Sequence, residues 1–425
     1  MSGPGATAGG PHLLEVGMRW PPETFVQRKL EGLAERGYRI TVASPANRVE
    51  ARAQVPGATL LNVPHWDAPR RAKLLGGLTG AARVGVRHPR RLRTLVRSIR
   101  ATAPAGQRGW RHTLAALRRF APLALVEPDI VHFEWESAAV DHMALLDVWD
   151  APTVVSCHGA GVNRQPYAAR WRERTLAGFP LVFRRAAVVH CVADAVAANA
   201  QRFGLDPEKA RIIRPGIDPA AFCPQPRPDG DGTLRLVTIA RLIWGKGFEY
   251  ALVAIGLLAE RGVPVHLEIL GTDPHPDIGE VSDRPRIEHT IDDLGLGDRV
   301  ALSGHLPPDQ VHAALCRADA YVHSALSEGL ATVIAEAMSC ALPVVATDVG
   351  GTRELVRDGV DGFVVPPRDP RAMAAALQRL WEEPERRRRM GDAARDRIRT
   401  DFTLERQVEL FAEMYAEVAR MGAAA

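Results

Sequence analysis

Residues 234–270, LRLVTIARLIWGKGFEYALVAIGLLAERGVPVHLEIL, indicate the fold of this chain most clearly. Leu234–Ile239 and Val265–Leu270 are short apolar runs with the length of buried strands. Phe248–Arg261, which lies between them, has the length and the periodicity of a helix. A strand, a helix and a second strand in this order predict a parallel sheet covered by helices.

The same alternation of short apolar runs and longer helical segments continues through the rest of the chain. It predicts further strands at His12–Val16, Arg39–Ala43, Ile130–Phe133, Thr153–Cys157, Ala187–Cys191, Val300–Ser303, Ala320–His323, Pro343–Ala346 and Gly362–Val365. It predicts further helices at Glu23–Arg36, Pro308–Ala318, Leu330–Ser339, Pro370–Trp381 and Leu404–Arg420. Asp369 as N-cap and Pro370 at the first helical position mark the start of one of these helices. The expected fold class is α/β, with two parallel-sheet domains.

A stretch rich in proline and glycine interrupts this periodicity at residues 206–232 and indicates a linker between domains. We therefore expect an N-terminal domain over 1–215, a linker over 216–232 and a C-terminal domain over 233–403. The last helix, within 404–425, is expected to pack back toward the N-terminal domain. Because ligands of open parallel sheets bind beyond the carboxyl ends of the strands, the cleft between two such domains is the expected active site.

The composition is that of a globular protein, with 425 residues, 46 % apolar and 24 % charged. It excludes disorder, collagen-like repeats and a coiled-coil rod. No apolar run is long enough to predict a membrane-spanning helix, and Met1–Gly10 lacks the basic and apolar regions of a secretory signal. The five cysteines form no CxxC pair, which is typical of reduced thiols in a cytosol.

Charge is distributed unevenly along the chain. Residues 1–220 carry 31 Lys and Arg against 18 Asp and Glu, whereas residues 221–425 carry 23 against 32. The most basic segment is 68–126, which has 14 basic residues and no acidic one. Two halves of opposite charge predict two domains with different partners.

The basic segment, taken as residues 70–119, has three interpretations. The apolar residues Leu92, Leu95, Val96 and Ile99 have helical spacing with arginines on the other face. Such a helix lies well on an anionic bilayer. The alternative is a solvated helix whose arginines face water. Nucleic acid is the weakest interpretation, because no stacking aromatics or known reader motif accompany the charge, and we expect no nucleic-acid partner.

The stretch most informative about function is Ser324–Glu354, SALSEGLATVIAEAMSCALPVVATDVGGTRE. Glu328 lies in the turn between a strand and a helix, where a carboxylate can point into a cleft. Thr332 and Val333 lie in the first turn of that helix, whose unpaired N–H groups and positive dipole end suit a diphosphate. Glu336, one turn on, can accept hydrogen bonds from ribose hydroxyls. On spacing alone, two solvated glutamates remain the alternative.

This stretch resembles the E-x7-E region of retaining family 4 glycosyltransferases, which have the GT-B fold of two Rossmann-like domains facing each other across a cleft. The shared residues are Ser324 or Ser327, Glu328, Gly329, Glu336, Ala337, Met338, Pro343, Val344, Val345, Ala346, Gly350, Gly351 and Glu354. The resemblance implies that Glu328 binds the hydroxyl groups of the donor sugar and that Glu336 binds the ribose. It also implies that the donor is contacted by Gly329, Leu330, Thr332 and Val333.

A second match, IARLIWGKG at residues 239–247, resembles the family's G-R-L-x-x-x-K-G. In the family this arginine and lysine hold the donor diphosphate, and here they are Arg241 and Lys246. The charge argument stands independently, because fixed cations stabilise the negative charge that develops on a departing nucleoside diphosphate. Two positions depart from the family pattern: Ala240 and Ala341 replace the usual glycines, each adding a methyl group where the backbone turns tightly or meets a ligand.

The first domain resembles the family only in patches. Cys157-His158-Gly159 resembles a segment whose histidine reaches toward the donor sugar, so His158 joins Arg241, Lys246 and Glu328 among the expected catalytic residues. Residues 20–26 resemble a subgroup that builds cell-surface polysaccharides.

Three residues are candidates for the acceptor side. Glu23 and Thr24 either contact the acceptor or cap the helix that begins there. Glu134 follows a strand and can line an acceptor site. One histidine with two acids at 132–136 is poor evidence for a metal site, so no metal ligand is expected.

We therefore expect a retaining, metal-independent glycosyltransferase of the hexosyltransferase type that acts in cell-surface polysaccharide or glycolipid biosynthesis. Its expected partners are a nucleotide-sugar donor and a glycan or lipid-linked acceptor, with no cofactor. The expected location is cytoplasmic, peripheral on the inner face of the membrane if residues 70–119 bind it. The alternative is a non-catalytic GT-B-like scaffold of polysaccharide assembly. A nicotinamide dehydrogenase is disfavoured because no G-x-G-x-x-G follows the first strand.

Overall fold

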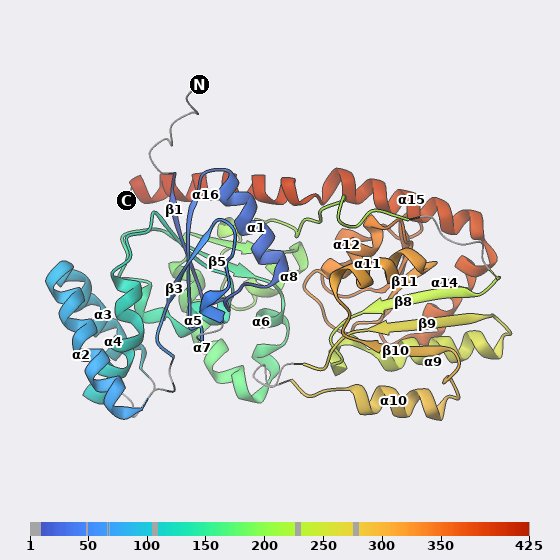
Figure 1. Cartoon of the computed structure of the whole chain (residues 1–425), viewed down its shortest axis with the longest axis horizontal. Coiled ribbons are helices and arrows are strands. Elements are labelled where there is room, and N and C mark those ends of the chain that lie inside the picture. Colours follow the sequence, from blue (N-terminus) through green and yellow to red (C-terminus); the bar gives the residue numbers. More distant parts are fainter. Residues whose placement is uncertain are drawn as a thin grey trace, which may run out of the picture. The chain divides into compact units, whose positions relative to one another are not determined.

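Two parallel sheets form the framework of the computed structural model (Figure 1), which confirms the predicted α/β fold class. One sheet has seven strands in the order β3-β2-β1-β4-β5-β6-β7, and the other has six in the order β10-β9-β8-β11-β12-β13. Helices pack on both sheets. The structure describes residues 10–47, 50–65, 67, 69–103, 109–225, 231–274 and 280–424.

The chain divides into two units, each with its own sheet. Unit 1 comprises Met1–Val192, Val196–Ile213 and Gln407–Ala425, and unit 2 comprises Ala193–Ala195 and Arg214–Arg406. Part of the expected linker, residues 226–230, lies outside the described residues.

Unit 1 contains the seven-stranded sheet and the helices of the first half of the chain. Its strands are β1 (His12–Val16), β2 (Arg39–Ser44), β3 (Ala58–Asn62), β4 (Ile130–Phe133), β5 (Thr153–Cys157), β6 (Val188–Cys191) and β7 (Ala210–Ile212). The helices of this half are α1 (Thr24–Glu35), α2 (Arg70–Arg87), α3 (Pro89–Thr102), α4 (Trp110–Ala124), α5 (Glu136–Asp141), α6 (Ala160–Asn163), α7 (Ala169–Arg185) and α8 (Asp194–Gln201). Most of α16 (Leu404–Ala424) also belongs to unit 1.

Unit 2 repeats the same alternation with the six-stranded sheet. Its strands are β8 (Leu234–Ile239), β9 (Val265–Leu270), β10 (Val300–Gly304), β11 (Ala320–His323), β12 (Val344–Thr347) and β13 (Gly362–Val365). Its helices are the short η5 (Trp244–Lys246), then α9 (Phe248–Glu260), α10 (Arg284–Asp293), α11 (Pro308–Arg317), α12 (Thr332–Ser339), α13 (Thr352–Leu355), α14 (Pro370–Glu382) and α15 (Pro384–Asp401).

Burial explains why several strands of unit 2 could be predicted from the sequence. Strands β11, β12 and β13 are buried along their whole length, and strands covered on both faces have continuous apolar sequences. The predicted start of α14 is also confirmed, since Asp369 accepts a hydrogen bond from the Ala372 N–H at 2.9 Å and Pro370 occupies the first helical position.

Each sheet has one point at which the strand order reverses. In unit 1 it lies between β1 and β4, and in unit 2 it lies between β8 and β11. Loops that leave neighbouring strands at such a point diverge, so ligands of open parallel sheets bind there, beyond the carboxyl ends. Residues in the loops that follow β1, β4, β8 and β11 are therefore placed to contact a ligand.

The basic segment 70–119 folds into α2, α3 and the first part of α4, with residues 104–108 outside the described residues. Leu95 and Ile99 on α3 are buried inside unit 1, so the apolar face expected to lie on a bilayer is not available to one. The exposed large apolar side chains of this segment lie on α2 and at the start of α4; they are Leu75, Leu78, Val86 and Trp110. No described helix is both long and apolar enough to cross a bilayer.

Candidate active site

Lys246 and Glu328 form an ion pair at the switch point of unit 2. Lys246 ends η5, just beyond β8, and Glu328 lies in the loop between β11 and α12. The Lys246 ammonium contacts Glu328 Oε1, and both side chains keep partial exposure, 18 % and 13 %. The structure therefore brings together two of the four residues expected to be catalytic, although 82 residues separate them in the sequence.

Backbone contacts fix the two loops that carry this pair. The Ser324 hydroxyl donates to the Lys246 carbonyl at 3.0 Å, and the Leu326 N–H donates to the Gly245 carbonyl at 2.9 Å. Gly247 has φ 60, and a Cβ there would lie 2.3 Å from the Ser324 carbonyl oxygen. Only glycine allows this approach, which explains the glycine after Lys246.

Glu328 is held as a carboxylate. Burial alone would raise its pKa, but the Lys246 ammonium, with His323 nearby, lowers the pKa of Glu328 to about 2. His323 Nε2 lies 3.2 Å from Glu328 Oε1. An ionised, acceptor-only carboxylate in this position is suited to receiving hydrogen bonds from hydroxyl groups.

The N-terminus of α12 lies directly after this loop. Its N-cap residue, Ala331, has no side-chain capping hydrogen bond, and Thr332 and Val333 begin the helix. The loop is supported by Gly350 and Gly351, since the Gly351 N–H donates to the Gly329 carbonyl at 2.7 Å and a Cβ at Gly350 would lie 2.2 Å from the Glu328 carbonyl oxygen. A helix start with no capping side chain can bind an anion through its N–H groups.

Glu336 lies on α12, half-buried, one turn beyond Thr332. Burial is the main cause that raises the pKa of the Tyr321 hydroxyl, and the negative charges of Glu336 and Glu328 raise it further. Both carboxylates are therefore near the same tyrosine, which donates a hydrogen bond to the Ile239 carbonyl at 3.2 Å. The two acids of the E-x7-E pattern thus both act on the electrostatics of one buried tyrosine.

Arg241 follows β8 but is paired differently from Lys246. Its guanidinium contacts the carboxylate of Glu280, and the arginine remains 41 % exposed. This partner could not be predicted from the sequence, because Glu280 is 39 residues away and lies in a segment without a predicted element.

Unit 1 has a carboxylate–cation pair at its own switch point. Glu134 follows β4 and is buried, and Lys29 Nζ from α1 lies 2.5 Å from its Oε2 and 3.3 Å from Glu15 Oε1. Burial alone would raise the pKa of Glu134, but Lys29 and the neighbouring histidines lower it well below the usual range. His158 Nε2 lies 3.1 Å from Glu134 Oε1. Glu134 is thus shielded from solvent, and it contacts His158, a second residue expected in the active site.

His158 is enclosed by aromatic rings. Trp135 packs with its ring centroid 4.5 Å from that of His158, and Phe25 makes an edge contact at 5.6 Å. The hydrogen bond to Glu134 and these two rings fix the orientation of the imidazole. Phe25 adjoins Thr24, so α1 contributes to the surroundings of His158.

The network continues deeper into unit 1. His132 Nδ1 lies 3.1 Å from Glu15 and 2.7 Å from the Tyr415 hydroxyl, and His132 Nε2 lies 2.7 Å from Ser156. Glu15, His132 and Glu134 are close enough together to hold a metal ion, but the Lys29 ammonium already contacts both carboxylates. The Lys29 cation therefore takes the place that a metal ion would need.

Glu23 occupies the N-cap position of α1 without a side-chain capping bond, and Thr24 is the first helical residue. The backbone carbonyl of Glu23 accepts a hydrogen bond from the Gln27 N–H at 2.9 Å. The capping interpretation of the Glu23 side chain therefore has no hydrogen bond to support it, and the acceptor-side interpretation stays a prediction.

The two alanines that replace family glycines behave differently. Ala341 has φ 56, in the left-handed region that favours glycine, so the expected tight turn is present there. Ala240 is not among the described residues with positive φ. The strain caused by the missing glycines is thus confined to the turn after α12.

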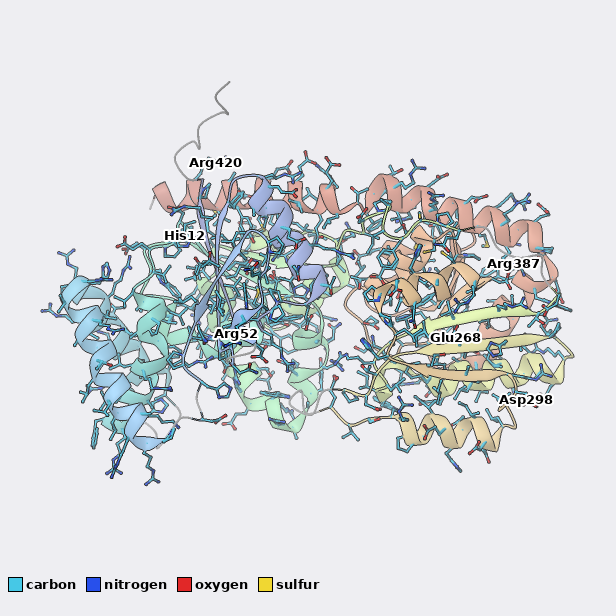
Figure 2. The ribbon with its side chains drawn as sticks, viewed as in Figure 1. His12, Arg52, Glu268, Asp298, Arg387 and Arg420 are labelled. Atoms are coloured by element: carbon cyan, nitrogen blue, oxygen red, sulfur yellow. The ribbon has the colours of Figure 1, made fainter. Side chains whose placement is uncertain are left out.

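The opposite end of the unit 2 sheet has a hollow of about 580 Å³ at the amino ends of the strands. Glu268 and Arg387, labelled in Figure 2, are among its lining residues. Arg387 lies 3.4 Å from Asp319, and Glu268 accepts a hydrogen bond from Ser303 at 2.8 Å. Arg317, 3.8 Å from Glu268, compensates the charge of that carboxylate, and none of the expected site residues lines this hollow.

Comparison with known proteins identifies the family. The model of the glycosyltransferase family 4 domain matches residues 22–221, and that of the glycosyl transferases group 1 domain matches residues 225–397. A D-inositol 3-phosphate glycosyltransferase of Geodermatophilus obscurus is 30 % identical over 336 residues, which cover 74 % of this chain and 72 % of that protein. The chain belongs to glycosyltransferase family 4. The resemblance predicted from its motifs is confirmed.

Other relatives of this family 4 member match over shorter stretches. The amylovoran biosynthesis glycosyltransferase AmsK of Erwinia amylovora is 27 % identical over 279 residues, 64 % of this chain and 66 % of that protein. The chain spans only about half to two thirds of the length of its curated relatives from colanic acid and amylovoran biosynthesis. Among solved structures, Anabaena HepE in complex with UDP and glucose superposes with a TM-score of 0.69 at 17 % identity, covering 96 % of this chain and 100 % of HepE. That similarity shows the GT-B fold.

Proposed function

We propose that this family 4 member is a retaining, metal-independent glycosyltransferase that moves a sugar from a nucleotide-sugar donor to an acceptor hydroxyl. The observation that carries the proposal is the Lys246–Glu328 pair beside the uncapped N-terminus of α12, at the switch point of unit 2. A cation, a helix start and an ionised carboxylate are the three groups that a diphosphate with an attached sugar requires.

Each group has a distinct role in the proposed reaction. Lys246, Arg241 and the N–H groups at Thr332 and Val333 stabilise the negative charge on the departing diphosphate. Glu328 and Glu336 accept hydrogen bonds from sugar and ribose hydroxyls, respectively. Gly329 and Leu330 form the loop that approaches the donor. The substitution takes place on one face of the sugar, and the leaving diphosphate itself helps to remove the acceptor proton.

Lys246 can serve the diphosphate only if it leaves Glu328. The pair is partly exposed, with Lys246 at the end of η5 and Glu328 in a loop. An incoming phosphate can therefore pair with the Lys246 ammonium, while Glu328 accepts hydrogen bonds from the sugar hydroxyls. Lys246 thus exchanges one anionic partner for another, and most of the cation is already removed from solvent before the donor arrives.

In unit 1, we propose that His158 takes part in the transfer and that Glu134 orients it. The supporting contacts are the 3.1 Å approach of Glu134 to His158 and the two aromatic rings around the imidazole. Glu23 and Thr24 stay candidates for contact with the acceptor. A glycan or a lipid-linked acceptor fits the relatives that act in polysaccharide biosynthesis.

The direct test is a panel of UDP-, GDP-, ADP- and dTDP-sugars, with nucleotide release measured for the wild type and for Lys246→Met. Lys73→Met is the matched control, because Lys73 lies on α2, far from the motif in sequence. We expect release from one nucleotide class, lost in Lys246→Met and kept in Lys73→Met. A folded wild type that neither releases nor binds any of these nucleotides favours the non-catalytic scaffold.

We also propose that the protein works at the inner face of the cytoplasmic membrane, through a surface that we name the basic face. On α3 the exposed arginines Arg90, Arg93, Arg97 and Arg100 form one row at helical spacing. On α2 the exposed apolar side chains are Leu75, Leu78 and Val86, with fractional exposures of 66 %, 56 % and 85 %. Basic and apolar side chains exposed together are what an anionic bilayer binds.

Sedimentation with anionic vesicles tests the basic face. We expect binding that weakens with salt and is lost when Arg90, Arg93, Arg97 and Arg100 are changed to Gln. The matched control changes four exposed arginines of unit 2, Arg371, Arg388, Arg389 and Arg399, to Gln. Equal loss in the control, or no binding by the wild type at low salt, would contradict the membrane proposal and leave the transfer reaction untouched.

A further inference from the structure

All three cysteines of unit 2 lie near a single histidine. His312 and Cys316 are four residues apart on α11, so they share one helical face, and Cys340 is the C-cap residue of α12. Cys223 precedes the sheet of unit 2 and reaches the same place through its backbone. These four residues could not be connected from the sequence, because no CxxC pair marks them.

The distances define a compact group of donor atoms. The ligand atoms of His312, Cys316 and Cys340 all lie within 4.8 Å of one another. His312 Nε2 is 3.3 Å from Cys316 Sγ, and the Cys223 carbonyl oxygen is 2.6 Å from that nitrogen and 3.5 Å from that sulfur. One imidazole nitrogen, two sulfurs and one oxygen therefore surround a common point.

These separations are close to those of a tetrahedral zinc site. Zn–S bonds of about 2.3 Å and Zn–N bonds of about 2.0 Å place neighbouring ligand atoms roughly 3.5 Å apart. Cys316 and Cys340 are buried, whereas Cys223 and His312 keep partial exposure, which provides a path of entry. Two buried thiols on rigid helices and two partly exposed donors fit the requirements of a structural metal site.

We propose that His312, Cys316 and Cys340, completed by Cys223, bind one thiophilic divalent cation of the zinc type. Cys223 supplies its carbonyl oxygen as the fourth ligand. When the cation binds, Cys316 and Cys340 each release a thiol proton to solvent, while the neutral His312 imidazole keeps its one proton on Nδ1, so that Nε2 is free to coordinate. The hydrogen bond from His312 to the Cys223 carbonyl is then replaced by coordination.

The proposed site joins the end of α12 to α11. Cys340 lies one turn beyond Glu336, so the cation holds the helix that presents the candidate donor-binding residues. The site is structural and plays no part in the proposed transfer step. It goes beyond the proposed function, and the experiment below uses no nucleotide, so its failure and the failure of the transferase proposal are distinguishable.

In the absence of a cation, burial favours the protonated form of the Cys340 thiol. Burial is the main cause that raises the pKa of the Cys340 thiol, and the neighbouring Cys316 raises it further. Binding is therefore expected to strengthen as the pH rises, because the cation must displace protons.

Cobalt titration of the full chain, reduced and stripped of metal, tests the site. We expect one Co²⁺ per chain, with the thiolate-to-cobalt charge-transfer absorption and the intense visible bands of a tetrahedral complex, and displacement by Zn²⁺. Zn²⁺ is expected to raise the Tm, and a chelator to lower it again. Cys316→Ser, Cys340→Ser and His312→Ala are expected to lose these effects. Cys191→Ala, which removes a buried cysteine of unit 1, is the control that keeps them.

Three results would overturn the proposal. One is a folded wild type that shows no thiolate-to-cobalt absorption, a measurement that does not depend on any variant folding. The other is a disulfide between Cys316 and Cys340 that forms under mild oxidation in a protein with no affinity for Zn²⁺, which would make the cluster a redox-sensitive pair instead. Cobalt binding that survives in Cys316→Ser and Cys340→Ser also excludes this site.

Discussion

In unit 1 the carboxylate that follows β4 pairs with a lysine from the helix after β1, and in unit 2 the carboxylate beyond β11 pairs with the lysine beyond β8. The two pairs occupy the same place in their sheets, beside the point where strand order reverses. They differ in exposure. Lys29 and Glu134 are each 2 % exposed, whereas Lys246 and Glu328 are 18 % and 13 % exposed.

The difference indicates two uses for one arrangement. Glu134 accepts from Lys29 and approaches His158, so its oxygens are occupied by groups of unit 1. A fully buried pair of this kind orients a neighbour and cannot exchange partners without losing much stability. Lys246, at the end of η5, and Glu328, in the loop before α12, are both partly accessible to solvent, so a ligand can separate them. Lys29 and Lys246 are also two of only four lysines in a chain with 50 arginines.

The largest expected effect is on the buried pair. Lys29→Met leaves Glu15 and Glu134 buried without a cation, which is expected to lower the free energy of unfolding by about 3–5 kcal/mol. Urea unfolding measures this, with Lys209→Met as the control, since Lys209 donates only to the Arg184 and Ala186 carbonyls. A change below that of the control would mean that Lys29 does not neutralise these carboxylates.

The pair in unit 2 is expected to respond in the opposite way, with a large loss of activity and a small loss of stability. Lys246→Met removes a cation from the leaving diphosphate, which is expected to lower kcat/KM by roughly 10²–10³-fold. The free energy of unfolding is expected to fall by about 1 kcal/mol, because the pair is partly exposed. Nucleotide release and urea unfolding on one preparation separate the two effects. Full activity in Lys246→Met would remove the residue from the mechanism.

A buried acid without a cation sharpens the contrast with Glu134. Burial raises the pKa of Glu136 from 4.5 to about 7, and its Oε1 has no hydrogen-bond partner among the described residues. Since the folded pKa is raised, stability is present below about pH 4.5 and is lost as the pH rises through about 7. Glu136→Gln is expected to remove this loss and to raise the free energy of unfolding at pH 8 by about 2 kcal/mol.

The pH dependence of unfolding checks this prediction. Thermal unfolding between pH 4 and pH 8 compares the wild type with Glu136→Gln and with Glu35→Gln, an exposed glutamate on α1. A wild type whose stability does not fall as the pH rises through 7, or falls equally in Glu136→Gln, contradicts the assignment.

The smallest expected effect concerns the turn after α12, which supports the exposed pair. Ala341 has φ 56, so Ala341→Gly is expected to relieve strain and raise the free energy of unfolding by about 1 kcal/mol. Ala240→Gly is the matched control and is expected to lower it by about 0.5–1 kcal/mol, since no positive φ compensates the flexibility of glycine. Equal signs for the two variants in urea unfolding would contradict the argument.

The buried strands could be predicted from the sequence, whereas half-buried elements could not. Strands β3 and β7 were missed because their residues are mostly partly exposed, which removes the apolar signal. Helix α2 was missed because it contains four glycines. At two of these positions the packing requires glycine. A Cβ at Gly77 would lie 2.2 Å from the Leu114 carbonyl oxygen, and a Cβ at Gly80 would lie 2.8 Å from Ala121 Cβ. Close packing against α4 outweighs the local propensity.

The candidate site was predictable where its residues lie in a motif. Lys246, Glu328 and Glu336 came from two such segments. Lys29 was missed because its partners are 14 and 105 residues away, and a charge pair of this kind has no local pattern. The helix carrying Leu95 and Ile99 was predicted, but its periodicity could not tell a bilayer from the interior of unit 1 as the environment of its apolar face.

The most direct test of the central claim is a crystal structure of the protein with a bound nucleoside diphosphate. We predict the diphosphate at the N-terminus of α12, within hydrogen-bond distance of Lys246 Nζ and of the N–H groups at Thr332 and Val333, with Lys246 no longer paired with Glu328. A nucleotide bound away from these groups, with the Lys246–Glu328 pair intact, would contradict the account.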